Sequence, residues 1–243
     1  MDSAENNASE LLLRPIWDVR QNALMAFRPE VSDLKYRHRR ALGTDGLTAA
    51  LNVVARRDRK GETTLALLPI EAKAVQQPKK LAVFTQALGL LPEQLRSRLV
   101  IEVLSVPAGL SARELQLQLK PITSLSRGFI CHAPVCAGRL RFFREAGAFA
   151  VGFDLAAERG RDEAELMKQI EAFVQRANAA RLKVIGHGCH SRSLVMSSVC
   201  AGVNFLSGDA IQAPVAATEG AVCFRPHHLF GLGRPRLVAT NCG

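Results

Sequence analysis

The sequence predicts a single α/β domain built on a parallel sheet or barrel, and three observations lead to this expectation. Short apolar runs alternate with segments of helical periodicity along most of the chain. No tract rich in Pro, Gly or Ser divides the chain into two parts. The 243 residues also suit one α/β barrel, because such barrels take about 200–250 residues.

Eight apolar runs are predicted to be strands. They are short and flanked by Gly, Pro or charged residues, as buried parallel strands usually are. The runs are residues 11–13, 23–27, 64–68, 99–103, 128–131, 148–153, 183–185 and 203–206. Residues 20–22 connect the first two runs so closely that we expect these two strands to form a hairpin.

Two segments between the strands carry clear helix signals. Ser111 and Glu114 have the spacing of a capping box, which predicts that a helix begins there. Residues 162–180 place apolar side chains, from Leu166 to Ala177, on one side of a second helix. Residues 1–9 are polar and are expected to be a disordered lead-in, so the domain is expected to span residues 10–243.

Composition and charge indicate a cytoplasmic protein. The formal net charge is +10, with much of the excess in residues 35–40 and 56–60, which raises the expectation of an anionic partner. One Trp and one Tyr offer little surface for stacking bases, so we interpret the basic segments as a solvated face and do not expect nucleic-acid binding. No apolar stretch approaches the roughly 18–20 residues of a membrane span, and the polar N-terminus does not resemble a signal peptide. The six cysteines are therefore expected to be reduced thiols.

The order of the strand-end motifs resembles that of EAL domains, the cyclic-di-GMP phosphodiesterases, over about residues 10–215. Seven segments carry the resemblance, each weak alone but together in the right order. Residues 14–20 resemble "QPIVDL", 23–27 the strand before the EAL signature, 99–103 "LEITE", 128–134 "DDFG", 151–154 "IKID", 183–190 "VIAEGVET", and 201–208 with Pro214 "GVDYVQGYLFSRP".

The resemblance implies a single modified TIM-type (β/α)8 barrel with its site at the carboxyl ends of the strands. Active EAL domains bind two divalent metal ions through carboxylates and an Asn, and the metal ions activate the water that attacks the phosphodiester. This chemistry needs hard oxygen ligands, so each expected ligand position can be compared with the residue that stands there.

Most of the ligand positions that the resemblance implies have lost their carboxylate or amide. Glu102 and Asp154 keep the acidic residue of the pattern. The other positions carry Arg28 for the Glu of the EAL triplet, Pro69 near the ligand Asn, His132 in the paired-Asp motif, Gly152 for the Lys of "IKID", and His187 and His190 for the two Glu of "AEGVE". We therefore expect no catalytic residue, metal or cofactor at these vestigial positions, and no hydrolysis of cyclic-di-GMP.

Two other roles for the altered site stay open. Arg28 either binds a phosphate group of cyclic-di-GMP or, as we favour, neutralises Glu102 or Asp154. The second role is a rebuilt transition-metal site. His132, His187 and His190, together with Cys131, Cys136 and Cys189, are nitrogen and sulfur ligands of the kind that bind Zn²⁺. We regard buried filler residues as the better interpretation of these side chains.

These considerations predict a catalytically inactive, degenerate EAL-like protein that acts in regulation or scaffolding through contacts with a protein partner. The main alternative is a receptor that binds cyclic-di-GMP without hydrolysing it, and the third hypothesis is an enzyme with a His/Cys metal site. The resemblance also implies that a homodimer is to be expected.

Overall fold

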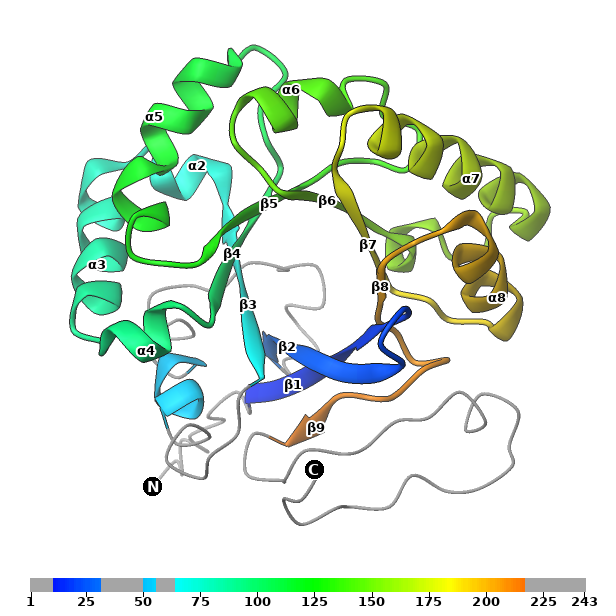
Figure 1. Cartoon of the computed structure of the whole chain (residues 1–243), viewed down its shortest axis with the longest axis horizontal. Helices are drawn as coiled ribbons and strands as arrows, with labels where there is room; N and C mark the ends of the chain where they lie inside the picture. Colours follow the sequence, from blue (N-terminus) through cyan, green and yellow to red (C-terminus); the bar gives the residue numbers. More distant parts are fainter. Residues whose placement is uncertain (1–10, 32–49, 56–63, 217–243) are drawn as a thin grey trace, which may run out of the picture.

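The computed structural model describes residues 11–31, 50–55 and 64–216 (Figure 1). The expected lead-in at residues 1–9, the basic segments at residues 35–40 and 56–60, and residues 217–243 of the expected domain lie outside these ranges.

Eight strands form a closed barrel, as the sequence predicts (Figure 1). The sheet runs in the order β2-β3-β4-β5-β6-β7-β8-β1, and pairing of β1 with β2 closes it. The neighbouring pairs from β2 to β8 are parallel, whereas β1 is antiparallel to both of its barrel neighbours. The strands are β1 (Leu11–Asp18), β2 (Ala23–Val31), β3 (Leu65–Glu71), β4 (Leu99–Leu104), β5 (Gly128–His132), β6 (Ala150–Asp154), β7 (Lys183–His187) and β8 (Phe205–Leu206).

The expected hairpin between the first two strands is confirmed. β1 and β2 pair antiparallel from Leu11 opposite Val31 to Asp18 opposite Ala23. Asn22 in the turn has a φ of 55°, a left-handed conformation that Asn adopts more readily than most residues. A further short strand, β9 (Val215–Ala216), also pairs with β1. The hairpin therefore makes β1 the one barrel strand that runs against the others.

Helices lie on the outside of the barrel along β3 to β8 (Figure 1). Residues 50–55 are helical, and the remaining helices are α2 (Ala72–Val75), α3 (Pro78–Gly89), α4 (Glu93–Arg96), α5 (Ala112–Thr123), α6 (Leu140–Glu145), the 3₁₀ helix η2 (Leu155–Glu158), α7 (Glu163–Ala179) and α8 (Arg192–Ala201). No helix in the described ranges is both long and apolar enough to cross a membrane.

Both sequence-predicted helices form where expected. At α5, the Ser111 hydroxyl accepts a hydrogen bond from the Glu114 amide at 3.2 Å, and the Glu114 carboxylate accepts one from the Ser111 amide at 2.8 Å. α7 begins after Asp162 and buries an apolar stripe that includes Phe173, whose ring packs edge-on against Phe153 of β6. Each fully buried large apolar side chain of this kind contributes about 1.5–3 kcal/mol, so burial of this stripe fixes α7 against the barrel.

Candidate functional site

The candidate site lies on top of an apolar layer inside the barrel. Because side chains alternate along a strand, every second residue faces the barrel interior. A separate apolar cluster collects such residues from the seven strands β1 to β7, and Phe205 of β8 packs against it. The buried members are Ile16, Ala26, Leu67, Val100, Ile130, Ala150 and Ile185, and Met25 and Leu65 also pack against them.

The next interior layer is polar, and it holds most of the positions singled out in the sequence. The mouth of the barrel lies one layer above the apolar cluster. It is reached two residues further toward the carboxyl end of each parallel strand, and two residues earlier in antiparallel β1. The mouth layer comprises Arg14, Arg28, Pro69, Glu102, His132, Gly152, His187 and Ser207. The barrel thus brings residues from eight distant segments into one ring.

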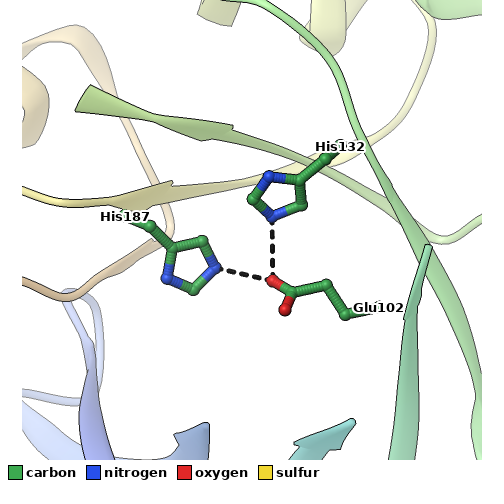
Figure 2. Close-up of side chains that lie close together, drawn as sticks. All are labelled: Glu102, His132 and His187. Carbon is green, nitrogen blue, oxygen red and sulfur yellow. Dashed lines mark hydrogen bonds and ion pairs between the residues drawn. The ribbon is translucent and has the colours of Figure 1, made fainter. Parts of the chain in front are cut away.

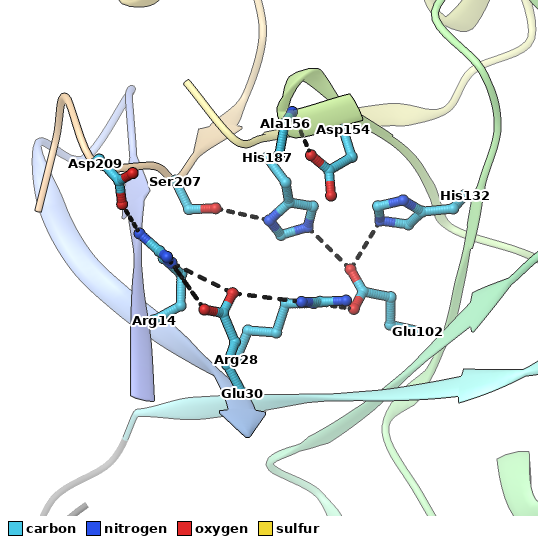
Figure 3. A network of polar contacts seen from close by, with 10 residues as sticks. All are labelled: Arg14, Arg28, Glu30, Glu102, His132, Asp154, Ala156, His187, Ser207 and Asp209. Carbon is cyan, nitrogen blue, oxygen red and sulfur yellow. Dashed lines mark hydrogen bonds and ion pairs between the residues drawn. The ribbon is translucent and has the colours of Figure 1, made fainter. Parts of the chain in front are cut away.

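A buried ion pair spans the mouth layer. Arg28 of β2 is 5% exposed and Glu102 of β4 is 0% exposed. The Arg28 Nε donates to Glu102 Oε2 at 2.5 Å, and the Arg28 Nη1 lies 3.5 Å from Glu30 Oε1 (Figure 3). The guanidinium is therefore already shared between two carboxylates and is covered from solvent.

Two imidazoles meet the other oxygen of the same carboxylate (Figure 2). His132 Nε2 lies 2.8 Å from Glu102 Oε1, at hydrogen-bond geometry. His187 Nε2 lies 2.9 Å from the same oxygen, but no hydrogen bond forms there, and among the described residues this buried nitrogen has no hydrogen-bond partner. The rings are stacked, with centroids 5.2 Å apart. One carboxylate thus holds a guanidinium on one oxygen and two imidazoles on the other.

Two small residues allow the imidazoles to take these positions. Gly152 pairs with His132 on the neighbouring strand, and a Cβ at residue 152 would lie 2.5 Å from His132 Nε2. Only glycine leaves space for the ring. Ser207, just after β8, places its hydroxyl oxygen 2.7 Å from His187 Nδ1 and orients that ring (Figure 3).

A second, more exposed set of charges borders the mouth. The Arg14 guanidinium contacts Glu30 Oε2 at 3.1 Å and Asp209 Oδ1 at 2.6 Å (Figure 3). Arg159 contacts the other oxygen of Asp209 at 2.9 Å. Glu30 therefore links this rim to the buried Arg28.

Asp154, Pro69 and His190 are the other positions singled out in the sequence, and none of them supplies an atom to the cluster of Glu102, His132 and His187. Asp154 lies two residues beyond Gly152 on β6, and its Oδ1 accepts a hydrogen bond from the Ala156 amide at 2.7 Å (Figure 3). Pro69 is buried in β3, beside Glu102 in register. His190 lies after β7, where its Nδ1 donates to the Gly188 carbonyl at 3.2 Å. His190 is therefore not part of the cluster around Glu102.

The predicted sulfur ligands do not join this cluster either. Cys131 and Cys189 are buried within the apolar core between barrel and helices. Burial raises the pKa of the Cys131 thiol, and it raises that of Cys189 to about 12. Cys136 is exposed. In the described part of the chain, the side chains able to hold a metal together are Glu102, His132 and His187.

Comparison with solved structures reveals the fold of EAL domains. The EAL domain of Mycobacterium smegmatis DcpA matches with a TM-score of 0.66 and 15% identity, covering 88% of this chain and 94% of that one. The PaMucR phosphodiesterase in complex with c-di-GMP matches at 0.68 and 14%, covering 86% and 97%. The Xanthomonas citri FimX EAL domain in complex with c-di-GMP matches at 0.63 and 14%, covering 85% and 87%. This chain has the EAL-type barrel fold. No family model and no curated protein sequence matches it.

Contacts within the mouth keep Glu102 and Arg28 ionised although both side chains are buried. Burial opposes ionisation of Glu102, but Arg28, followed by the two imidazoles, outweighs it and holds the pKa of this carboxyl well below its usual range. Burial likewise opposes the charge of Arg28, yet Glu102 raises the pKa of the guanidinium. For His132, burial prevails over the attraction of Glu102 and lowers the pKa of the imidazole, which favours the neutral ring at pH 7.

The mouth does not fit the pair of hard divalent ions that the resemblance to EAL domains implies. Such a pair needs several oxygen ligands in addition to solvent. Arg28, Pro69 and Gly152 offer no side-chain oxygen, and one oxygen of Glu102 is bound to the guanidinium. Glu102, His132 and His187 instead offer one oxygen and two nitrogens that lie within 4.8 Å of one another.

Sequence reasoning missed three residues that shape this EAL-type mouth. Glu30 lies two residues beyond Arg28 on the same strand, so strand periodicity alone could have placed both on one face. Arg14 pairs with Arg28 across the hairpin, a register that the sequence does not specify. Ser207 contacts His187 only because β7 and β8 are neighbours.

Proposed function

We propose that the protein is a catalytically inactive EAL-fold regulator that acts through contacts with another protein. The observation that carries the loss of catalysis is the buried pair of Arg28 and Glu102. A cation stands where the EAL pattern has a metal-binding Glu, and it binds the acidic residue that the pattern retains. Without a pair of metal ions, the barrel has no means of generating the nucleophilic water of the EAL reaction.

The intact barrel and the apolar side chains on its surface support a regulatory role through protein contacts. The fold keeps a complete barrel with helices packed on it, so the molecule offers a stable surface without the two-metal chemistry. Some large apolar side chains on that surface are uncovered, among them Leu117 of α5, which is 58% exposed. Exposed apolar side chains of this kind supply contact area in protein interfaces.

A cyclic-di-GMP receptor without hydrolysis is the alternative function. It is favoured by the fold similarity to structures that hold c-di-GMP and by the net charge of +10. Against it, Arg28 is 5% exposed and shared between two carboxylates, so binding a phosphate would require breaking both contacts. Arg28 therefore serves better as the neutralising cation of the mouth than as a phosphate anchor.

Calorimetric titration with cyclic-di-GMP separates these two functions. We expect no heat of binding for the wild-type protein. Binding at micromolar or tighter affinity that is lost in Arg28→Met would instead support the receptor function.

Capture of partners from the native cell tests the regulatory role. We expect the tagged wild-type protein to retain a specific partner, and Leu117→Ser serves to probe the α5 face. Arg113→Ser, an exposed substitution on the same helix, is the matched control. If the wild-type protein captures nothing beyond what a tagged unrelated protein captures, the regulatory proposal is wrong.

A further inference from the structure

The contact between His187 and Glu102 is not accounted for by hydrogen bonding. His187 is 4% exposed, and its Nε2 faces Glu102 Oε1 at 2.9 Å without a hydrogen bond. A buried polar nitrogen without a partner costs free energy, and native proteins rarely leave one in that state. A group bound to His187 Nε2 would satisfy this nitrogen, whereas Glu102 Oε1 already accepts a hydrogen bond from His132 Nε2.

We propose that the mouth binds one divalent transition-metal ion, with Zn²⁺ as the first candidate, through Glu102 Oε1, His132 Nε2 and His187 Nε2. These three atoms lie within 4.8 Å of one another, and each comes from the carboxyl end of a different strand. The proposal goes beyond the loss of hydrolysis, and neither depends on the other.

The spacing of the three atoms suits a metal ion after small shifts. Ligands about 2.0–2.1 Å from a tetrahedral Zn²⁺ lie about 3.3 Å from one another. The two nitrogens lie 2.8 and 2.9 Å from the Glu102 oxygen, so each of these two distances has to lengthen by about 0.5 Å. Two His, one Glu and an open fourth position form a known zinc ligand set.

Neighbouring residues hold the imidazoles in the orientation that a metal needs. A ligating His generally forms a hydrogen bond through its other ring nitrogen, which fixes the tautomer. Ser207 provides that contact at His187 Nδ1. Gly152 provides the space in which the His132 ring turns its Nε2 toward Glu102.

Arg28 does not prevent a cation from binding at this point. Its guanidinium bonds to Glu102 Oε2 and approaches Glu30, whereas the imidazoles meet Glu102 Oε1. Arg28 therefore takes the place of an outer-shell partner that orients the ligating carboxylate. Its positive charge is balanced by the two carboxylates that it contacts.

The ligand set also selects the class of metal. Imidazole nitrogens suit Zn²⁺ and neighbouring transition metals, whereas Mg²⁺ prefers oxygen ligands. This inference reverses the sequence-based expectation of a metal-free mouth. The reason is the convergence of three atoms on one point and the unpartnered nitrogen of His187, which motif comparison could not reveal.

Competition with a chromophoric chelator tests the proposal directly. The full chain is stripped of metal and titrated with Zn²⁺, and with Mg²⁺ as the contrasting ion. We expect one Zn²⁺ per chain, no competition from Mg²⁺, and an affinity that falls at least tenfold in both His132→Gln and His187→Gln. His190→Gln is the matched control, because His190 lies nearby but outside the cluster, and its affinity should equal that of the wild type. Zn²⁺ binding that is absent, or equal in all four proteins, would overturn the proposal.

A spectrum of the Co²⁺-loaded wild-type protein covers the case in which a variant fails to fold. Nitrogen and oxygen ligands in low coordination should give visible d–d bands without thiolate charge-transfer absorption. Strong thiolate absorption, or the spectrum of free aqueous Co²⁺, would show that the metal is not bound by this set. Neither result bears on hydrolysis of cyclic-di-GMP. The proposed metal site can therefore be refuted without refuting the proposed loss of catalysis.

Discussion

Replacing Arg28 by Met tests whether the buried cation stabilises the mouth. Removing one member of a buried ion pair leaves an uncompensated charge and costs about 3–5 kcal/mol. Arg28 and Glu102 are both buried, so the variant must either keep a buried carboxylate without its main partner or bind a proton. Protonating a Glu of ordinary pKa about 4.3 at pH 7 costs about 3.7 kcal/mol, which sets the scale of the second outcome.

We therefore expect Arg28→Met to lose about 2–4 kcal/mol of unfolding free energy at pH 7. The assay is urea denaturation in the presence of a chelator, and a thermal midpoint about 4–16 °C lower is the corresponding change. Arg141→Met is the control, since its ion pair with Glu145 is exposed on α6, and it should cost about 1 kcal/mol or less. The double variant Arg28→Met with Glu102→Gln should recover part of the loss. A loss below about 1 kcal/mol for Arg28→Met would refute the reasoning.

The same variant has a defined dependence on pH. In the wild-type protein the pKa of Glu102 is held low, so its contribution to stability is present above the unfolded pKa and is lost as pH falls through the folded pKa. Without Arg28, burial acts in the opposite direction, and the folded variant binds a proton more readily than the unfolded chain. Its stability relative to wild type should therefore improve from pH 7 to pH 5, by at most about 1.4 kcal/mol per pH unit. A difference that stays constant over this range would contradict the assigned electrostatics.

Three further predictions concern other parts of the barrel. Gly152→Ala should cost about 1–3 kcal/mol in urea denaturation, because the new Cβ meets His132 Nε2 at 2.5 Å; unchanged stability would mean that the ring moves freely. Ser111→Ala should cost about 1 kcal/mol in the same assay through loss of the capping box, and a neutral result would contradict that role. In native protein, a maleimide should label exposed Cys136 and spare Cys189, as read by peptide mass spectrometry; equal labelling would show that the core around Cys189 opens readily.

The fold was predictable because its signals are local and repeated. Apolar runs with turn residues on either side marked all eight strands, and the capping pattern at Ser111 marked the start of α5. The order of strand-end motifs then supplied the closed barrel. Barrel closure in turn determines which residues share a layer, so the meeting of Arg28, Glu102, His132 and His187 followed from strand periodicity.

The chemistry of the site was less predictable because it depends on atoms rather than on positions. Whether Arg28 binds one oxygen of Glu102 or both decides whether the other oxygen is available to the imidazoles, and a sequence does not contain that information. The exclusion of His190 arises from the turn after β7, where its ring bonds to the Gly188 carbonyl. Cys131 faces the core because it alternates with His132 on one strand, so strand periodicity could have excluded it.

Incubation with cyclic-di-GMP and saturating Mg²⁺ or Mn²⁺ tests the proposed loss of catalysis most directly. The products are separated by chromatography, and the wild-type protein is compared with Glu102→Gln. If Arg28 has replaced the metal pair, the dinucleotide stays intact in both samples and at all protein concentrations. Hydrolysis by the wild-type protein that disappears in Glu102→Gln would contradict the proposed function and show that this barrel is an active phosphodiesterase.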